Sequence, residues 1–117
     1  MIEENVKIKF LQKIIDETKS DNLLWNRKWS ADSEYGIGYI YGAVLKNNNT
    51  IEIFRYRNES FSMGDVLPFF KLYVGKHNSQ YTSTSNDSCH KLLTNICMLV
   101  DSTIQNDSDQ VILDYLK

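Results

Sequence analysis

One stretch of the sequence decides the fold of this chain: residues 35–76, which read YGIGYIYGAVLKNNNTIEIFRYRNESFSMGDVLPFFKLYVGK. Apolar and polar side chains alternate along it, and a period of two is typical of β-strands that have one covered face. It divides into three strand-like segments, about 34–45, 50–58 and 67–75. The three asparagines 47–49 tolerate the left-handed backbone of a hairpin turn, and 60–65 form the next connection. We therefore expect an antiparallel three-stranded meander.

The alternation predicts two different faces for this sheet. On one face we expect helices to cover the apolar positions Ile40, Val44, Phe54, Tyr56, Phe70, Leu72 and Val74. The opposite face should remain open and carries tyrosines and bases, namely Tyr39, Tyr41, Arg55, Arg57, Lys71 and Tyr73.

Amphipathic helices flank the meander. Residues 3–19 and 88–105 each place apolar side chains on one arc. Asn86 or Asp87 can cap the second helix. A weak variant of the reciprocal capping box at 107–110 predicts a separate short helix, which should bury Val111, Ile112, Tyr115 and Leu116. Residues 23–29 fit either a short strand or an ordered connection, and 78–87 read as a polar loop. The expected order αβββαα gives a two-layer α+β domain over residues 1–117, with the helices on one face.

Composition limits the function classes. A chain of 117 residues and 13.6 kDa is long enough to form a buried core without disulfides or metal. The net charge of −2 argues against a dedicated duplex-DNA binder. The longest apolar run, 96–100, is too short to span a bilayer, and the acidic start lacks an apolar signal-peptide core. We expect a cytoplasmic protein that does not enter membranes.

The cysteines fit a reducing compartment. Cys89 and Cys97 lie eight residues apart on a predicted helix, about 12 Å at 1.5 Å rise per residue, which is too far for a disulfide. Cys89 lies in the apolar arc and is interpreted as a packing residue. Cys89 and His90 point about 100° apart and cannot chelate one metal together.

Catalytic signatures do not stand out. The glycines Gly36, Gly38 and Gly42 have the wrong spacing for a phosphate-binding loop and lie within a strand. The acidic side chains gather around the C-terminal helices, where capping and solvation explain them. We expect no enzyme activity, no cofactor and no bound metal.

The tyrosine/base face is the best candidate binding surface, together with Trp29. Tyrosines provide flat contact area, and arginines bind phosphate or carboxylate groups in a bidentate manner. Trp25 is expected to close one end of the core. Two alternatives remain for this face: it is merely solvated, or the face or the edge of the first predicted strand forms a homodimer.

The amino-acid bias indicates an AT-rich genome. Ala, Gly, Pro and Arg number 11, whereas Ile, Lys, Asn, Tyr, Phe and Met number 47. Residues 10–18 (FLQKIIDET), followed by Leu24-Trp25, resemble small uncharacterised α+β proteins of Firmicutes and their prophages. The resemblance covers the first quarter of the chain and implies no activity.

These observations favour a small non-enzymatic protein of a bacterium or phage that binds and modulates another macromolecule. An inhibitor of host defence fits this description. A second hypothesis is a binder that sequesters a nucleotide or other small molecule between the sheet and the Trp25–Trp29 segment. A third is a single-stranded nucleic-acid binder.

Overall fold

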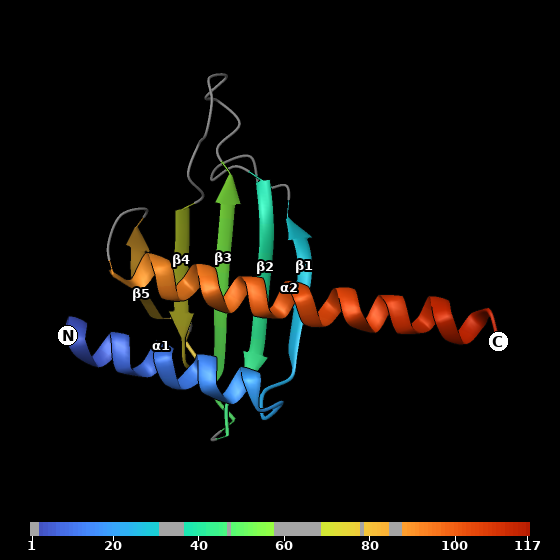
Figure 1. Ribbon diagram of the computed structural model, residues 1–117. Helices are drawn as coiled ribbons and strands as arrows, with labels where there is room; N and C mark the ends of the chain where they lie inside the picture. Colours follow the sequence, from blue (N-terminus) through green and yellow to red (C-terminus); the bar gives the residue numbers. More distant parts are fainter. Residues whose placement is uncertain (1–2, 31–36, 47, 58–68, 78, 85–87) are drawn as a thin grey trace.

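The computed structural model describes residues 3–30, 37–46, 48–57, 69–77, 79–84 and 88–117. Five strands form one antiparallel sheet in chain order, β1-β2-β3-β4-β5. One helix precedes the sheet and another follows it (Figure 1). The elements are α1 (Glu4–Lys19), β1 (Trp25–Ser30), β2 (Ile37–Val44), β3 (Thr50–Arg57), β4 (Phe69–Val74), β5 (Ser79–Thr84) and α2 (Ser88–Tyr115).

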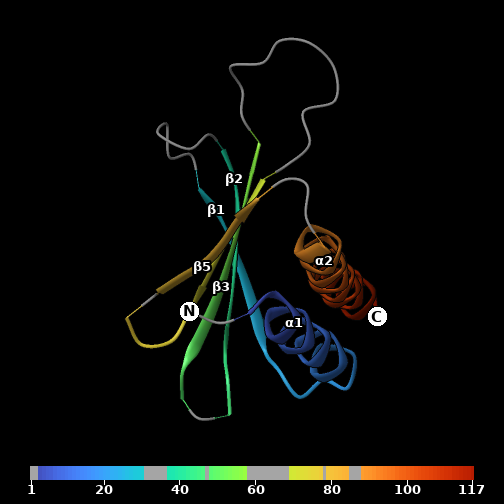
Figure 2. The ribbon, with the colours of Figure 1, turned by 90° about the vertical axis from the view of Figure 1, so that its left-hand side faces the viewer.

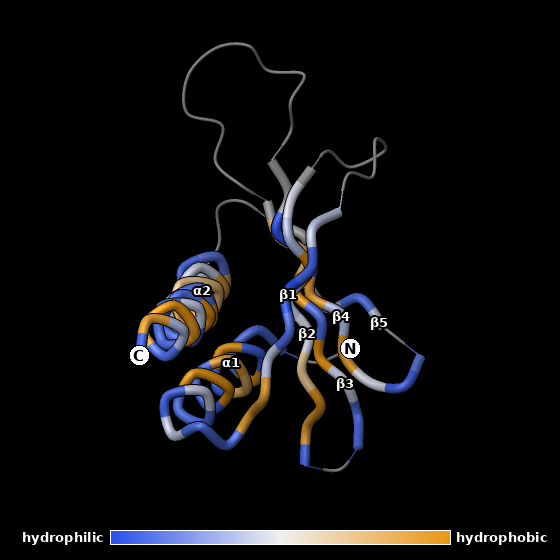
Figure 3. Tube along the Cα trace, turned by 90° about the vertical axis from the view of Figure 1, so that its right-hand side faces the viewer, coloured by the Kyte–Doolittle hydropathy of each residue, from blue (hydrophilic) through white to orange (hydrophobic). Residues whose placement is uncertain are grey.

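Both helices lie side by side on the same side of the sheet (Figure 2). Apolar residues concentrate where α1, α2 and the strands meet, and again near the C-terminal end of α2 (Figure 3). Such amphipathic elements are stable only when their apolar faces are buried against one another. The core consists of Leu11, Ile14, Leu23, Tyr41, Ala43, Ile51, Ile53, Phe70, Leu72, Cys89, Leu93, Ile96, Cys97 and Val100.

The α+β class is confirmed, but the expected order αβββαα is wrong. Residues 25–30 form β1, and the segment read as a polar loop contains β5. The sequence of β5 is SQYTST, which has no apolar alternation, so its strand character comes from pairing with β4. The predicted first strand corresponds to β2, which is paired on both sides, so the unpaired edge expected there does not exist.

The predicted assignment of faces is wrong for β2 and β3. Residues directly opposite in an antiparallel pair share a face, and the register places Tyr41 opposite both Arg27 and Ile53. Tyr41 and Ile53 are fully buried under the helices. Ile40, Val44 and Phe54 therefore belong to the opposite face, where Val44 is 60% exposed.

In β4 the predicted faces are right. Phe70 and Leu72 are buried on the helix side. Lys71 pairs in register with Phe54, and Tyr73 with Glu52, on the side away from the helices. The sequence therefore predicted the two faces of β4 correctly and exchanged the two faces of β2 and β3.

The C-terminal residues form one helix, not two. Gln105 donates to Asp109 at 3.0 Å and Gln110 to Asp114 at 2.8 Å, so side-chain hydrogen bonds four residues apart span the region predicted to break. The residues expected to be buried there are exposed: Val111 by 68%, Ile112 by 58%, Tyr115 by 90% and Leu116 by 77%. The sequence predicted that these side chains are buried, and in the described part of the chain no packing covers them.

Other local predictions are confirmed. α1 has nearly the expected bounds, and Asn48 adopts the left-handed backbone with φ of 65° in the turn between β2 and β3. Cys89 and Cys97 are buried thiols and are not joined by a disulfide. The connection at 60–65 and the caps expected at 86–87 lie outside the described residues.

Candidate functional site

Asp101 organises a cluster of polar side chains between α2 and the first three strands. Its Oδ1 atom accepts hydrogen bonds from Arg27 Nη1 on β1 at 2.7 Å and from the Tyr41 hydroxyl on β2 at 2.9 Å. Its Oδ2 atom lies 3.8 Å from Arg55 Nη1 on β3. Arg55 also lies close enough to the Tyr41 hydroxyl to lower its pKa, against the larger effect of burial. One carboxylate from the helix thus holds side chains from three neighbouring strands.

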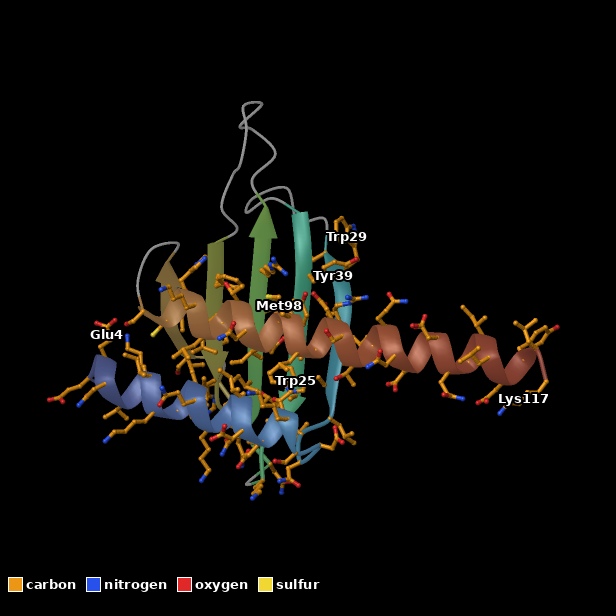
Figure 4. All side chains as sticks on the ribbon, viewed as in Figure 1. Glu4, Trp25, Trp29, Tyr39, Met98 and Lys117 are labelled. Atoms are coloured by element: carbon orange, nitrogen blue, oxygen red, sulfur yellow. The ribbon has the colours of Figure 1, made fainter. Side chains whose placement is uncertain are left out.

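Two aromatic rings extend this cluster to the surface. Trp29 and Tyr39 pack edge to face with ring centroids 5.0 Å apart, and the Arg27 guanidinium carbon lies 4.5 Å from the Tyr39 centroid. Trp29 is 57% exposed. Figure 4 shows Trp29 and Tyr39 together beside α2 on the side away from α1. We call Arg27, Trp29, Tyr39, Arg55 and Asp101 the aromatic–arginine patch.

The environment of the patch shifts three ionisation equilibria. The hydrogen bond to Asp101 raises the pKa of Arg27, which therefore stays charged. Burial, with smaller effects of Cys97 and Asp101, raises the pKa of Tyr41 well above its usual range. Burial also raises the pKa of the Cys97 thiol to about 12. Cys97 is therefore a neutral packing group near pH 7 and a poor nucleophile.

Four of the predicted site residues come together here, namely Trp29, Tyr39, Tyr41 and Arg55. The sequence predicted Tyr41 on the open face, and this is wrong: Tyr41 is fully buried and supports the patch from below. Lys71 and Tyr73 lie on the opposite face, where Tyr73 packs against Phe54 with ring centroids 5.0 Å apart. Arg57 ends β3, and its side chain lies outside the described residues.

The predicted set of site residues contained neither Arg27 nor Asp101. Trp25 and Trp29 bracket Arg27 in the sequence, and reading this alternation as a strand places all three side chains on one face. Asp101 carries no local signal, because its partners Tyr41 and Arg27 are 60 and 74 residues away in the chain.

Trp25 lies at the other end of β1 and packs against the core, as predicted. Its indole Nε1 donates to Thr18 Oγ1 at 3.0 Å, and Thr18 donates in turn to the Ile14 carbonyl at 2.7 Å. The Trp25–Trp29 segment is a strand of the sheet, so it does not form a separate wall over a ligand as one hypothesis required.

Within the described ranges, no three His, Cys, Asp or Glu side chains come together as a metal site. The helices of the described chain also lack a stretch both long and apolar enough to cross a bilayer. Comparison with protein-family models, curated proteins and solved structures found no match for this chain. The resemblance of its first quarter to proteins of Firmicutes and their prophages stays a prediction.

Proposed function

We propose that this chain is a non-enzymatic binding protein whose partner is another protein that presents acidic side chains to the aromatic–arginine patch. The observation that carries the proposal is the charge balance of the patch. Two guanidinium groups share one carboxylate, and the side chains of Arg27, Arg55 and Asp101 are 25%, 31% and 35% exposed. Arg55 lies beyond hydrogen-bond distance of Asp101, so a carboxylate of the partner would offer it a closer ion pair.

The aromatic side chains fit the role of contact anchors. Tryptophan, tyrosine and arginine dominate the binding energy of protein interfaces. Trp29 offers a large exposed ring, and Tyr39 is already held between that ring and Arg27. Because these side chains are ordered before binding, less conformational entropy is lost when a partner docks.

A protein partner is favoured over a nucleotide or a single strand. Arg27 occupies one face of the Tyr39 ring, so that face cannot also stack on a base. Single-strand binding needs a basic groove with successive stacking rings. Lys71 and Tyr73, which would have extended such a track, belong to the other side of the sheet.

Capture experiments with matched variants test the proposal. The wild-type chain is immobilised beside Trp29→Ser, Arg55→Gln and the control Val44→Ser, which removes an exposed apolar side chain from the opposite face. We expect wild type and control to retain a stoichiometric protein from lysate of a low-GC bacterium, and both patch variants to lose it. Retention should weaken with added salt, because exposed ion pairs are screened.

Two results would count against the proposal. One is equal retention by all four proteins while each variant melts cooperatively. The other is a nucleotide or nucleic acid released from the denatured wild-type chain, which would favour the other hypotheses. Identification of the retained protein also tests the expectation that a host-defence component is the target.

A further inference from the structure

The C-terminal part of α2 projects beyond β1, away from the sheet (Figure 1). We call residues 105–116 the arm. At 1.5 Å rise per residue it is about 17 Å long. All of its residues are exposed. Its large apolar side chains Val111, Ile112, Leu113, Tyr115 and Leu116 are each more than half exposed.

The arm continues the apolar stripe with which α2 covers the sheet. Val100 is buried and Ile104 is partly buried against the core. At 100° per residue, Val111 and Tyr115 fall within about 60° of them around the helix axis. A separate helix as short as the 12-residue arm would be only marginally stable in water. Clustered exposed apolar side chains such as those of the arm mark interaction sites.

A groove lies where the arm leaves the sheet. It has a volume of about 270 Å³, and its lining includes Leu24, Trp25 and Ile104, with Asp21 and Asp107 as its acidic side chains. Sites for drug-sized ligands span roughly 300–1,000 Å³, so this volume suits one or two side chains of a protein better.

We propose that a second copy of this chain covers the arm. The two arms run antiparallel about a twofold axis, with Val111 and Ile112 of both copies meeting near that axis. Because each arm starts at its own groove and is about 17 Å long, its tip reaches the groove of the partner when the two arms overlap fully. Tyr115 and Leu116 then enter that groove.

Charge and symmetry favour a second copy over an unrelated protein. Lys117 directly follows the arm, whose own charged side chains are all acidic; its Nζ lies 3.9 Å from Asp114 Oδ1, and its side chain is 79% exposed. The groove that receives it carries Asp21 and Asp107. In a twofold assembly each copy contributes one arm and one groove, so each contact occurs twice and the interface closes on itself.

Light scattering on the full chain tests this arrangement, which does not depend on the partner of the aromatic–arginine patch. At micromolar concentration, wild type should show twice the 13.6 kDa mass of one chain. The variant Tyr115→Ser/Leu116→Ser should be monomeric at this concentration, because its dimer dissociation constant should rise at least tenfold. The control Met98→Ser, which changes an exposed apolar residue elsewhere on α2, should remain dimeric. Near-equal melting of dilute monomers would show that each variant still folds.

A covalent cross-link tests the geometry itself. In Leu24→Cys/Leu116→Cys the two new thiols lie at opposite ends of the arm and cannot meet within one chain. Mild oxidation should therefore yield a disulfide-linked dimer, whereas Met98→Cys/Leu116→Cys should not. A monomeric wild type, a tip variant that stays dimeric, or no cross-link between positions 24 and 116 would each overturn the proposal.

Discussion

Replacing Asp101 by asparagine tests the cluster from which the functional proposal is built. The substitution keeps the shape of the side chain and removes its charge. Asparagine offers one acceptor oxygen where the carboxylate offers two. Its amide group would face Arg27 or Arg55, which are themselves donors. Both the ion pairs and the hydrogen bond from Tyr41 are therefore weakened by a single change.

The expected loss of stability follows from the geometry. A hydrogen bond to a charged group contributes about 1.5–3 kcal/mol when shielded, whereas exposed ion pairs contribute about 0–1 kcal/mol. Asp101 is 35% exposed, so the Arg27 contact at 2.7 Å falls between these limits. With the weaker Tyr41 bond, Asp101→Asn should lower the free energy of unfolding by about 1–3 kcal/mol. For a chain of this size that corresponds to a fall in melting temperature of roughly 4–12 °C.

Urea denaturation followed by circular dichroism measures this loss, with an unchanged m-value as the sign that the same surface unfolds. Asp109→Asn is the matched control, since it removes one charge from the exposed arm and leaves the cluster intact. A loss below about 0.5 kcal/mol for Asp101→Asn, or an equal loss in the control, would refute the structural role assigned to Asp101.

Binding of the acidic partner should become stronger in Asp101→Asn, although the variant is less stable than wild type. Asp101 competes with an acidic partner for the two arginines, so its neutralisation raises the positive charge of the patch. We expect Asp101→Asn to retain the captured protein at higher salt than wild type does. A merely structural role would weaken binding together with stability, so the two readouts separate the explanations.

Two further perturbations have definite expected outcomes. The contribution of Cys97 to stability should be constant up to about pH 9 and that of Tyr41 up to about pH 10; above these values each should fall by up to ~1.4 kcal/mol per pH unit, because the unfolded chain releases these protons first. The pKa of Cys97 is raised from 9.0 to about 12 in the folded chain, so its contribution is lost between about pH 9 and 12, and Cys97→Ala should reduce this pH dependence in denaturation curves. Trp25→Phe should cost about 1 kcal/mol or more through loss of the hydrogen bond to Thr18, measured by the same denaturation assay. Its fluorescence, which then comes from the exposed Trp29 alone, should lie to the red of wild type, and a blue shift would contradict the assigned exposures.

The sequence predicted correctly those elements that are defined by patterns between residues close together in the chain. The broad apolar arc of α1 gave its bounds, and asparagine chemistry gave the turn at Asn48. β5 was missed because its polar sequence becomes a strand only through hydrogen bonds to β4. The break in α2 was wrongly predicted because Asp107 and Asp109 resemble a helix start, although they are equally compatible with an exposed helix face.

The inverted faces have a physical reason. Tyrosine and arginine were counted as polar, yet Tyr41 places its ring in the core while its hydroxyl reaches Asp101. A better signal was present in β3, where Ile51 and Ile53 flank Glu52. Two β-branched residues around an acid indicate the buried face more reliably than Phe54, and that choice would have turned Arg55 toward the helices.

The partly buried contacts of Asp101 with Arg27 and Tyr41 also account for the position of α2 on the sheet. Its apolar stripe runs from Cys89 to Tyr115 with similar side chains, so hydrophobic burial alone would permit the helix to slide along its axis by about one turn, or 5.4 Å. Such a shift would move Asp101 out of reach of Arg27 and Tyr41 and leave charged groups partly buried without partners, which is costly. The cluster therefore determines which part of the stripe covers the sheet and which part projects as the arm. Amide hydrogen exchange along α2 in Asp101→Asn tests this directly. If the cluster determines the register, protection from exchange should extend beyond residues 89–104 into the arm. If the protected region still ends where it does in wild type, apolar packing alone determines the register.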